Sequence, residues 1–345
     1  MMRRILGWVW RSLVLRYKWN GPFPYEALRK DPLPTAACVD LGAFRKPLPD
    51  YQEIETLVIM EDRQPKFFLS YDGYKPNEKV PLNRHGPYRH YILQKDLKEL
   101  VIKLHQKKKK VLIGFWAFWS DGIRGPTAWL KKHPELKSRR SDEADIGNPF
   151  AVLSQEKIPF VSHIVAQYKK LQKDFQFDGL FLGDGLNGFR NFWDPNLYRD
   201  QIDKIPLMTE FYRVIAETIH KSGGELWTYD CRGFSYEEAK LHGTDYRLLS
   251  KAGLDILVFQ DYPIAWGYYF NLPDKKDPQK SFEAFKTVKQ ALENTKTLFY
   301  YSLELEDTAE KWWAPHEAIK KQMGRFSIAD GKFLVWGNET MARNY

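Results

Sequence analysis

A short apolar segment with polar ends lies near the middle of the 345-residue chain and reads FDGLFLGDG over residues 177–185. Leu180, Phe181 and Leu182 form a continuous apolar run, which is typical of a strand buried on both faces of a parallel sheet. The stretch before it, Phe160–Phe175, repeats apolar residues at helical spacing. A helix that leads into a buried strand predicts one βα unit of an α/β protein.

The same alternation extends along most of the chain, and no linker demands a second domain. The candidate strands are Thr56–Met60, Phe67–Tyr71, Lys110–Trp116, Gly179–Gly183, Glu225–Tyr229, Asp255–Phe259, Thr297–Tyr301 and Lys332–Trp336. The candidate helices are Leu93–Leu104, Phe160–Phe175, Pro206–His220, Phe282–Leu292 and Trp312–Met323. We therefore predict a (β/α)8 TIM barrel, the economical architecture for such a series of units.

The first two candidate strands raise a problem of connection. Only Asp62–Lys66 separates them, whereas a helical crossover between parallel strands needs about a dozen residues or more. Either Thr56–Met60 lies outside the barrel and Cys38–Leu41 supplies the first strand, or an irregular link replaces a helix. Residues before 50 are rich in proline, so we expect an N-terminal extension over 1–50 packed on a catalytic barrel over 51–345.

The composition is that of a soluble globular protein, with 43% hydrophobic and 28% charged residues. No uninterrupted run of about 18 apolar residues occurs, which excludes a normal membrane span. The formal net charge of +9 permits contact with a polyanion, but the excess is diffuse. Its densest cluster, Lys107–Lys110, falls between a predicted helix and a predicted strand, where it reads as a solvated helix end.

The cysteines and the N-terminal segment bear on the cellular compartment. Cys38 and Cys231 cannot build a disulfide framework, although one bridge between them stays possible. The apolar run near the N-terminus stops at Arg11 and no convincing cleavage site follows, so we expect the segment to be retained. These features favour a cytoplasmic protein and leave secretion open, and they say nothing about oligomeric state.

The sequence contains no complete motif for a known cofactor or metal site. Gly183, Gly185 and Gly188 have the spacing of a dinucleotide fingerprint, but a loop sequence follows them where a helix is required. No two histidines stand at metal-ligand spacing on a predicted helix. We expect neither a cofactor nor a metal.

Acidic residues repeatedly follow the predicted strands. Barrel enzymes carry their active sites at the carboxyl ends of the strands, so acids at these positions are more informative than others, although some acids there only cap helices. The acids in question are Asp72, Asp121, Asp184, Asp230, Asp261, Glu304, Glu306 and Glu339.

Aromatic residues, 15% of the chain, recur beside these acids. Rings offer stacking faces to sugars while carboxylates orient hydroxyl groups and transfer protons, so the combination favours a saccharide site. The candidate substrate-binding residues are Trp116, Trp119, Asn187, Trp227, Arg232, Tyr262, Glu304 and Trp336.

The segment FDGLFLGDG resembles the fourth strand of barrel glycoside hydrolases of the α-amylase and α-galactosidase clans. In those proteins an Asp-Gly pair opens the strand and an Asp at its far end is the nucleophile. The resemblance implies a structural role for Asp178 and makes Asp184 the nucleophile candidate. The usual spacing puts the second Asp five residues after the first, where this chain has Gly183, and a bulge at Gly183 or Gly185 would re-aim Asp184.

Glycoside hydrolysis needs a second carboxyl group that protonates the leaving oxygen. In the same clans this acid comes from the fifth strand as Glu or the sixth as Asp. Asp261 matches the second pattern, whereas Asp230 has Arg232 nearby, which would disfavour a protonated carboxyl group. The candidates rank as Asp261, Asp230 and Glu304.

The leading interpretation is a glycosidase of the retaining type that acts on an oligo- or polysaccharide. A noncatalytic carbohydrate-binding barrel is the alternative, consistent with Gly183 at the usual nucleophile position. Nucleic-acid binding ranks third, because a polyanion would meet the acids that dominate the predicted strand ends. The expected partner is therefore a carbohydrate, with no nucleic acid.

Overall fold

The fold is described from a computed structural model. The description covers residues 36–40, 54–60, 71–82, 90–116, 160–183, 204–230, 233–241, 243–260, 278–303 and 332–337.

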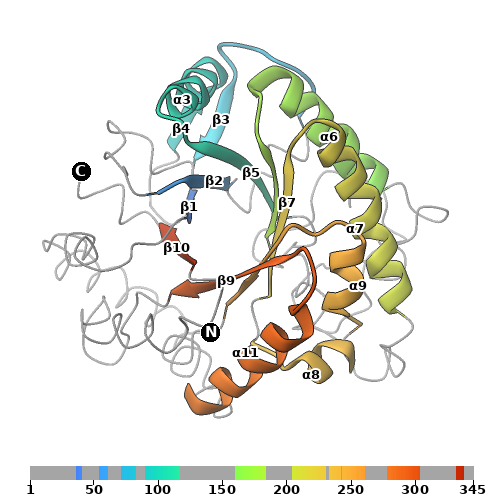
Figure 1. The fold of residues 1–345 in the computed structure, drawn as a ribbon. Coiled ribbons are helices and arrows are strands. Elements are labelled where there is room, and N and C mark those ends of the chain that lie inside the picture. Colours follow the sequence, from blue (N-terminus) through green and yellow to red (C-terminus); the bar gives the residue numbers. More distant parts are fainter. Residues whose placement is uncertain are drawn as a thin grey trace, which may run out of the picture.

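Eight parallel strands form the centre of the molecule and close into a ring (Figure 1). The strands are β1 (Ala36–Asp40), β2 (Thr56–Met60), β5 (Lys110–Trp116), β6 (Gly179–Gly183), β7 (Glu225–Asp230), β8 (Ile256–Phe259), β9 (Leu298–Leu303) and β10 (Phe333–Gly337). Neighbours in the ring follow the chain order, and β1 closes it by pairing with both β2 and β10. A separate antiparallel pair is formed by β3 (Lys79–Leu82) and β4 (His90–Leu93).

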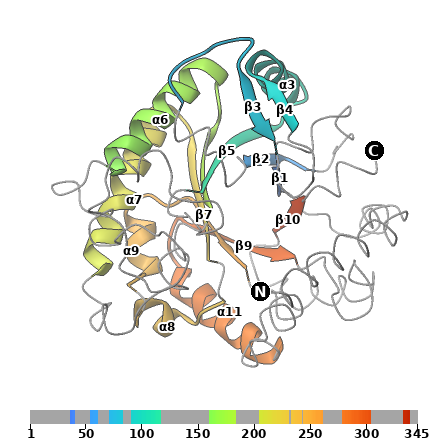
Figure 2. The same ribbon diagram turned by 180° about the vertical axis from the view of Figure 1, so that it is seen from behind.

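The described helices lie outside the ring of strands (Figures 1 and 2). They are α3 (Gln94–Gln106), α6 (Phe160–Phe175), α7 (Lys204–Lys221), α8 (Tyr236–Leu241), α9 (Tyr246–Lys251) and α11 (Pro278–Leu292). Four of the helices predicted from apolar spacing are confirmed, while Trp312–Met323 lies outside the described residues. Most of the segments that link β1 to β2 and β9 to β10 also lie outside the described residues. The alternation of strands with helices is therefore established for the middle of the chain.

The first barrel strands differ from the prediction. Thr56–Met60 is a barrel strand, and its partner on one side is β1, which lies inside the predicted extension 1–50. Tyr71, the end of the predicted strand 67–71, is not in a strand, and its hydroxyl donates to Asp174 on α6 at 2.6 Å. The barrel therefore begins before residue 51, and the short link after Met60 no longer has to join two neighbouring strands.

Alternate residues of the strands form two separate cores. One alternation fills the inside of the barrel, where Phe181 and Tyr229 lie with ring centroids 5.5 Å apart. The other packs against the helices, as Phe299 does against Phe285 on α11 at 4.8 Å. Because buried side chains fill the interior, the barrel is a packed core, and a ligand has access only at its ends.

The strands are staggered around the ring by a fixed amount. The paired residues lead from Asp40 through Met60, Gly114, Phe181, Trp227 and Ile256 to Leu298. When this row of paired residues is continued from β9 to β10 and from β10 to β1, it returns to β1 at a position eight residues before Asp40. A stagger of about eight residues for eight strands is characteristic of TIM barrels.

Gly179 is required at the start of β6 because the backbone of β7 passes directly beside it. A Cβ atom at residue 179 would lie 2.2 Å from the carbonyl oxygen of Glu225 and 2.7 Å from its amide nitrogen. We expect Gly179→Ala to lower the free energy of unfolding by about 3 kcal/mol, measured by denaturant titration. Gly73→Ala is the control, since its methyl group meets open space and costs only the strain of a φ of 132°, about 1 kcal/mol. Equal losses for the two variants would contradict the steric explanation.

Candidate active site

The carboxyl ends of the parallel strands meet at one edge of the barrel, which we call the mouth. In the described chain, β6, β7 and β8 are the fourth, fifth and sixth barrel strands, and they are direct neighbours. Asp184 follows β6 in the chain, Asp230 ends β7, and Asp261 comes two residues after the end of β8. The topology thus leads to all three acidic positions from adjacent strands, although Asp184 and Asp261 lie outside the described residues.

The end of β6 shows why the glycine before Asp184 matters. Phe181 belongs to the interior core, so Gly183, two residues later, continues the inward alternation. The inward position five residues after Asp178 is therefore occupied by glycine. A catalytic role for Asp184 requires the chain to depart from strand alternation after Gly183, as a bulge would allow.

Asp230 is fully buried at the end of β7. It alternates with Thr228, whose hydroxyl lies 2.8 Å from the hydroxyl of Tyr212 on the outer helix α7. The Asp230 carbonyl accepts the amide N–H of Gln260 at 2.8 Å, which ties the ends of β7 and β8 together. The strand alternation thus directs this residue toward the helices.

The other candidate binding residues fall into three groups. Trp116 and Trp336 occupy the ends of β5 and β10, and their register partners are Gly183 and Cys38. Trp227 is only 1% exposed and belongs to the interior core, which places it away from a solvent-filled cleft. The residues outside the described part of the chain are Trp119, Asn187, Arg232, Tyr262 and Glu304.

Asp72 follows no described barrel strand, because Tyr71 before it is not in a strand and the neighbours of β2 in the ring are β1 and β5. Its carboxylate is exposed and accepts a hydrogen bond from the Lys75 ammonium group at 2.7 Å. That hydrogen bond lowers the pKa of Asp72 below its ordinary value, so the carboxylate stays ionised.

The end of the barrel opposite the mouth, which we call the lower end, contains Asp178. The glycosidase resemblance marks this residue as structural. Its carboxylate Oδ2 accepts the backbone N–H of Val111 on β5 at 2.7 Å and lies 2.9 Å from Nε2 of His105 on α3. The backbone of Asp178 also bonds to Val111 and Glu225. This residue therefore joins β5, β6, β7 and the end of α3, and the structural role implied by the resemblance is confirmed.

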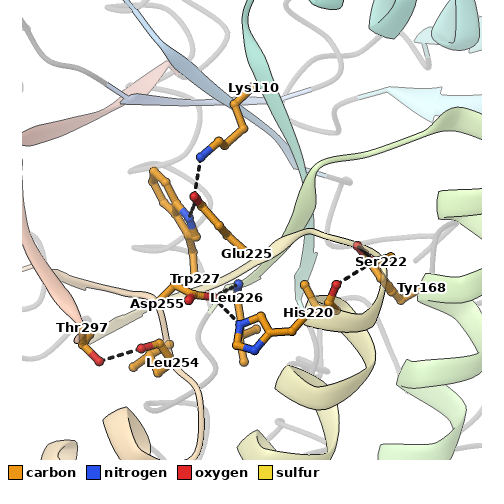
Figure 3. A network of polar contacts seen from close by, with 11 residues as sticks. Lys110, Tyr168, His220, Ser222, Glu225, Leu226, Trp227, Leu254, Asp255 and Thr297 are labelled. Atoms are coloured by element: carbon orange, nitrogen blue, oxygen red, sulfur yellow. Dashed lines mark hydrogen bonds and ion pairs between the residues drawn. The ribbon is translucent and has the colours of Figure 1, made fainter. Parts of the chain in front are cut away.

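A second arrangement of the same kind was not predicted from the sequence. Oδ2 of Asp255, directly before β8, accepts the N–H of Leu226 at 2.7 Å and lies 2.8 Å from Nε2 of His220 on α7 (Figure 3). In both cases the acid stands directly before one strand and accepts a backbone N–H from the start of the preceding strand. It also contacts a histidine near the end of the helix that leads into that preceding strand. The available signal is a histidine six residues before Val111 and again six before Leu226.

Charged residues occupy the interior at this lower end. Glu225 pairs with Lys110 through one carboxylate oxygen and accepts the indole N–H of Trp227 at 2.9 Å through the other (Figure 3). Lys332 lies 5.8 Å from the ring centroid of Tyr300, a distance suited to a cation–π contact. The lower end is thus bound together by internal polar contacts.

The Asp178 contacts predict a loss of stability without a loss of chemistry. Asp178→Ala leaves the buried N–H of Val111 without its acceptor, so we expect the free energy of unfolding to fall by about 2 kcal/mol. Asp255→Ala is expected to act alike, whereas Asp72→Ala should leave the stability almost unchanged, because the Asp72 carboxylate is exposed. Urea titration of the three variants checks this, and a loss for Asp72→Ala as large as for Asp178→Ala would contradict it.

Two further properties concern only the described part of the chain. No group of three or more His, Cys, Asp or Glu residues there could hold a metal ion. Within the same residues, no helix is long and apolar enough to cross a bilayer.

Comparison with known proteins identifies a fold. No protein-family model matches the chain, and no curated protein matches its sequence. Among solved structures it is similar to the PgaB glycoside hydrolase domain of Bordetella bronchiseptica, with a TM-score of 0.52, 13% identity, and coverage of 90% of this chain and 96% of that one. The glycoside hydrolase domain of PelA from Pseudomonas aeruginosa gives a TM-score of 0.51 and 11% identity over 90% and 97% of the two chains.

An α-galactosidase from Thermus thermophilus is also similar, with a TM-score of 0.51, 12% identity, and coverage of 88% of this chain and 57% of that one. These likenesses show that the chain shares its barrel fold with glycoside hydrolases of known structure. No single family is defined at such identities.

Proposed function

We propose that the chain is a glycoside hydrolase, a complete (β/α)8 barrel that cleaves an oligo- or polysaccharide between two carboxylates at its mouth. One observation carries the proposal. The Asp178-Gly179 pair stands at the base of the fourth barrel strand, and Asp184 follows the far end of that same strand, as in the resembled clans. The fold shared with the PgaB and PelA glycoside hydrolase domains supports the same class.

The proposed reaction is retaining. The carboxylate of Asp184 attacks the anomeric carbon as Asp261 donates a proton to the leaving glycosidic oxygen, which gives a glycosyl ester on Asp184 and a free alcohol. Asp261, now ionised, then takes a proton from water as the water oxygen attacks the anomeric carbon, which breaks the bond from that carbon to the Asp184 carboxylate and releases the sugar. The burial of Asp230 on the helix side of β7 supports Asp261 ahead of Asp230 as the acid, with Glu304 as the third choice.

A noncatalytic carbohydrate-binding barrel is the second candidate. The observation in its favour is Gly183, which occupies the inward position at the end of β6. This alternative shares the aromatic residues and the mouth with the first and differs in having no nucleophile.

The test is a panel of α- and β-linked aryl glycosides and oligosaccharides, with release of the aryl group or reducing sugar as one readout and calorimetric binding as the other. Turnover with retention at the anomeric centre, followed by NMR, is the expected result. Binding without turnover would establish the noncatalytic barrel instead. Absence of both across the panel would contradict either carbohydrate function.

A further inference from the structure

An acid that the sequence did not assign to the site stands at the mouth. Asp40 is the last residue of β1, and the prediction placed it in the N-terminal extension. In the structure it pairs in register with Met60, the last residue of β2. It therefore occupies the same edge of the barrel as the ends of β5 and β6.

The register places Asp40 on the inward alternation of β1. Its partner Met60 is fully buried in the interior core. The next residue in the row is Gly114, and a Cβ atom there would lie 2.0 Å from the sulfur of Met60, so this row faces the inside of the barrel. Parallel neighbours in register occupy the same face of a sheet, so the position of Asp40 is an inward one.

The stagger of the barrel also identifies which residue shares its level. In a barrel with this stagger, the residues of one interior layer come from alternate strands. Trp227 on β7 pairs with Ile256 on β8, and Ile256 pairs with Leu298 on β9. The residue two positions after Leu298 on β9 is Tyr300. The rings of Trp227 and Tyr300 are in contact, with centroids 5.3 Å apart, which verifies the rule.

Lys110 and Glu225 obey the same rule at the lower end. They lie on alternate strands with the same offset, and they form an ion pair. The same rule applies to β1. Asp40 pairs with Met60 on β2, Met60 pairs with Gly114 on β5, and the residue two positions after Gly114 is Trp116. An acid position and an aromatic position therefore share the uppermost interior layer.

The location of β1 fixes what this acid can do. β1 is three strands away from β6 in one direction and from β8 in the other, so it lies on the wall opposite the strands that precede Asp184 and Asp261 in the chain. With eight strands spaced about 4.8 Å apart, opposite backbones are roughly 15 Å apart, so side chains from opposite walls can contact one sugar ring that lies above the packed interior. An acid on this wall faces the side of the sugar remote from the proposed nucleophile.

We infer that Asp40 is a substrate-binding carboxylate that accepts hydrogen bonds from hydroxyl groups of the sugar unit at the cleavage point, with Trp116 supplying a ring face beside it. This inference rests on the proposed function and adds a recognition element to it. A carboxylate is costly inside an apolar layer unless water or a ligand meets it. At the lower end the inward carboxylate of Glu225 has Lys110 and Trp227 as partners, and for the inward position of Asp40 the proposal makes the sugar hydroxyl groups the partners.

The test compares Asp40→Asn with Asp72→Asn, an equivalent change at an exposed acid that follows no described barrel strand. With the best panel saccharide we expect Asp40→Asn to weaken affinity by about tenfold to a hundredfold, as loss of a charge-assisted hydrogen bond would. Affinity is measured by calorimetry in an Asp184→Asn background, which prevents turnover. Monodeoxy forms of the saccharide should lose affinity for the protein with Asp40 and much less for Asp40→Asn.

A second readout does not depend on activity. Labelling of carboxyl groups with a water-soluble carbodiimide, followed by mass spectrometry, should modify Asp40 in the free protein and spare it when saccharide is bound. Saccharide affinity unchanged by Asp40→Asn, or an unreactive Asp40, would overturn the inference while leaving the proposed function intact. A protein that binds and hydrolyses no saccharide, with Asp40 equally reactive throughout, would overturn both.

Discussion

Replacing Asp184 by Asn is expected to reduce kcat/KM for glycoside hydrolysis by at least about a thousandfold, because no other proposed group would form the glycosyl ester. The melting temperature should change little, since Asp184 comes after the last residue of β6 in the chain. Steady-state kinetics on the best aryl glycoside, with calorimetric melting of both proteins, measures the two effects. Unaltered turnover in Asp184→Asn would remove this residue from the nucleophile role.

Two further variants separate the roles of the carboxylates. Asp184→Ala with added azide should recover activity, because azide attacks the anomeric carbon as the aryl group leaves and yields a glycosyl azide. Asp261→Asn should slow poor leaving groups far more than activated ones, since only the former need protonation. If Asp230→Asn shows this leaving-group pattern and Asp261→Asn does not, the acid is Asp230.

The second large effect is expected for Trp227→Ala, and it is a loss of stability. The ring is 1% exposed, contacts Tyr300 and donates its N–H to Glu225. Truncation of a buried aromatic residue costs about 3–5 kcal/mol. We expect a large fall in the denaturant midpoint, with saccharide affinity per folded molecule unchanged.

Trp227→Phe is the matched control, because it keeps a ring in the interior and removes the indole N–H. Its expected loss is about 1–2 kcal/mol, from the missing hydrogen bond to Glu225 and the smaller ring. A Trp227→Ala protein that is as stable as the wild type but binds saccharide weakly would place the ring in a cleft and contradict the core assignment.

The helices of the barrel could be predicted well from the sequence because their apolar spacing is a local signal. Phe160–Phe175 was predicted with the bounds that the structure gives it. β1 was missed as a companion of Thr56–Met60, since Ala36–Asp40 contains a single β-branched residue and prolines flank it. Its assignment depends on pairing with β2 and β10, which are distant in the chain.

The site was harder to predict than the fold. A strand that is apolar on both faces has no alternation to read, so the sequence around Trp227 did not reveal which of its residues face the interior. The role of Asp178 followed from a family resemblance, while the similar Asp255 was overlooked because its bonds to Leu226 and His220 join separate elements. The acids that follow the strands directly could be proposed for the mouth from the sequence, and that assignment stays a prediction, whereas the position of Asp40 required the register of the ring.

The paired arrangements of Asp178 with His105 and Asp255 with His220 have a consequence for how this protein can change. They join β5 to β6 and β7 to β8 at the lower end, far along each strand from the mouth. Loops at the mouth can then be exchanged or lengthened without loosening these joints. The same separation makes the barrel a suitable host for grafted loops, in which a new specificity is selected at one end while the other end keeps the strands in register.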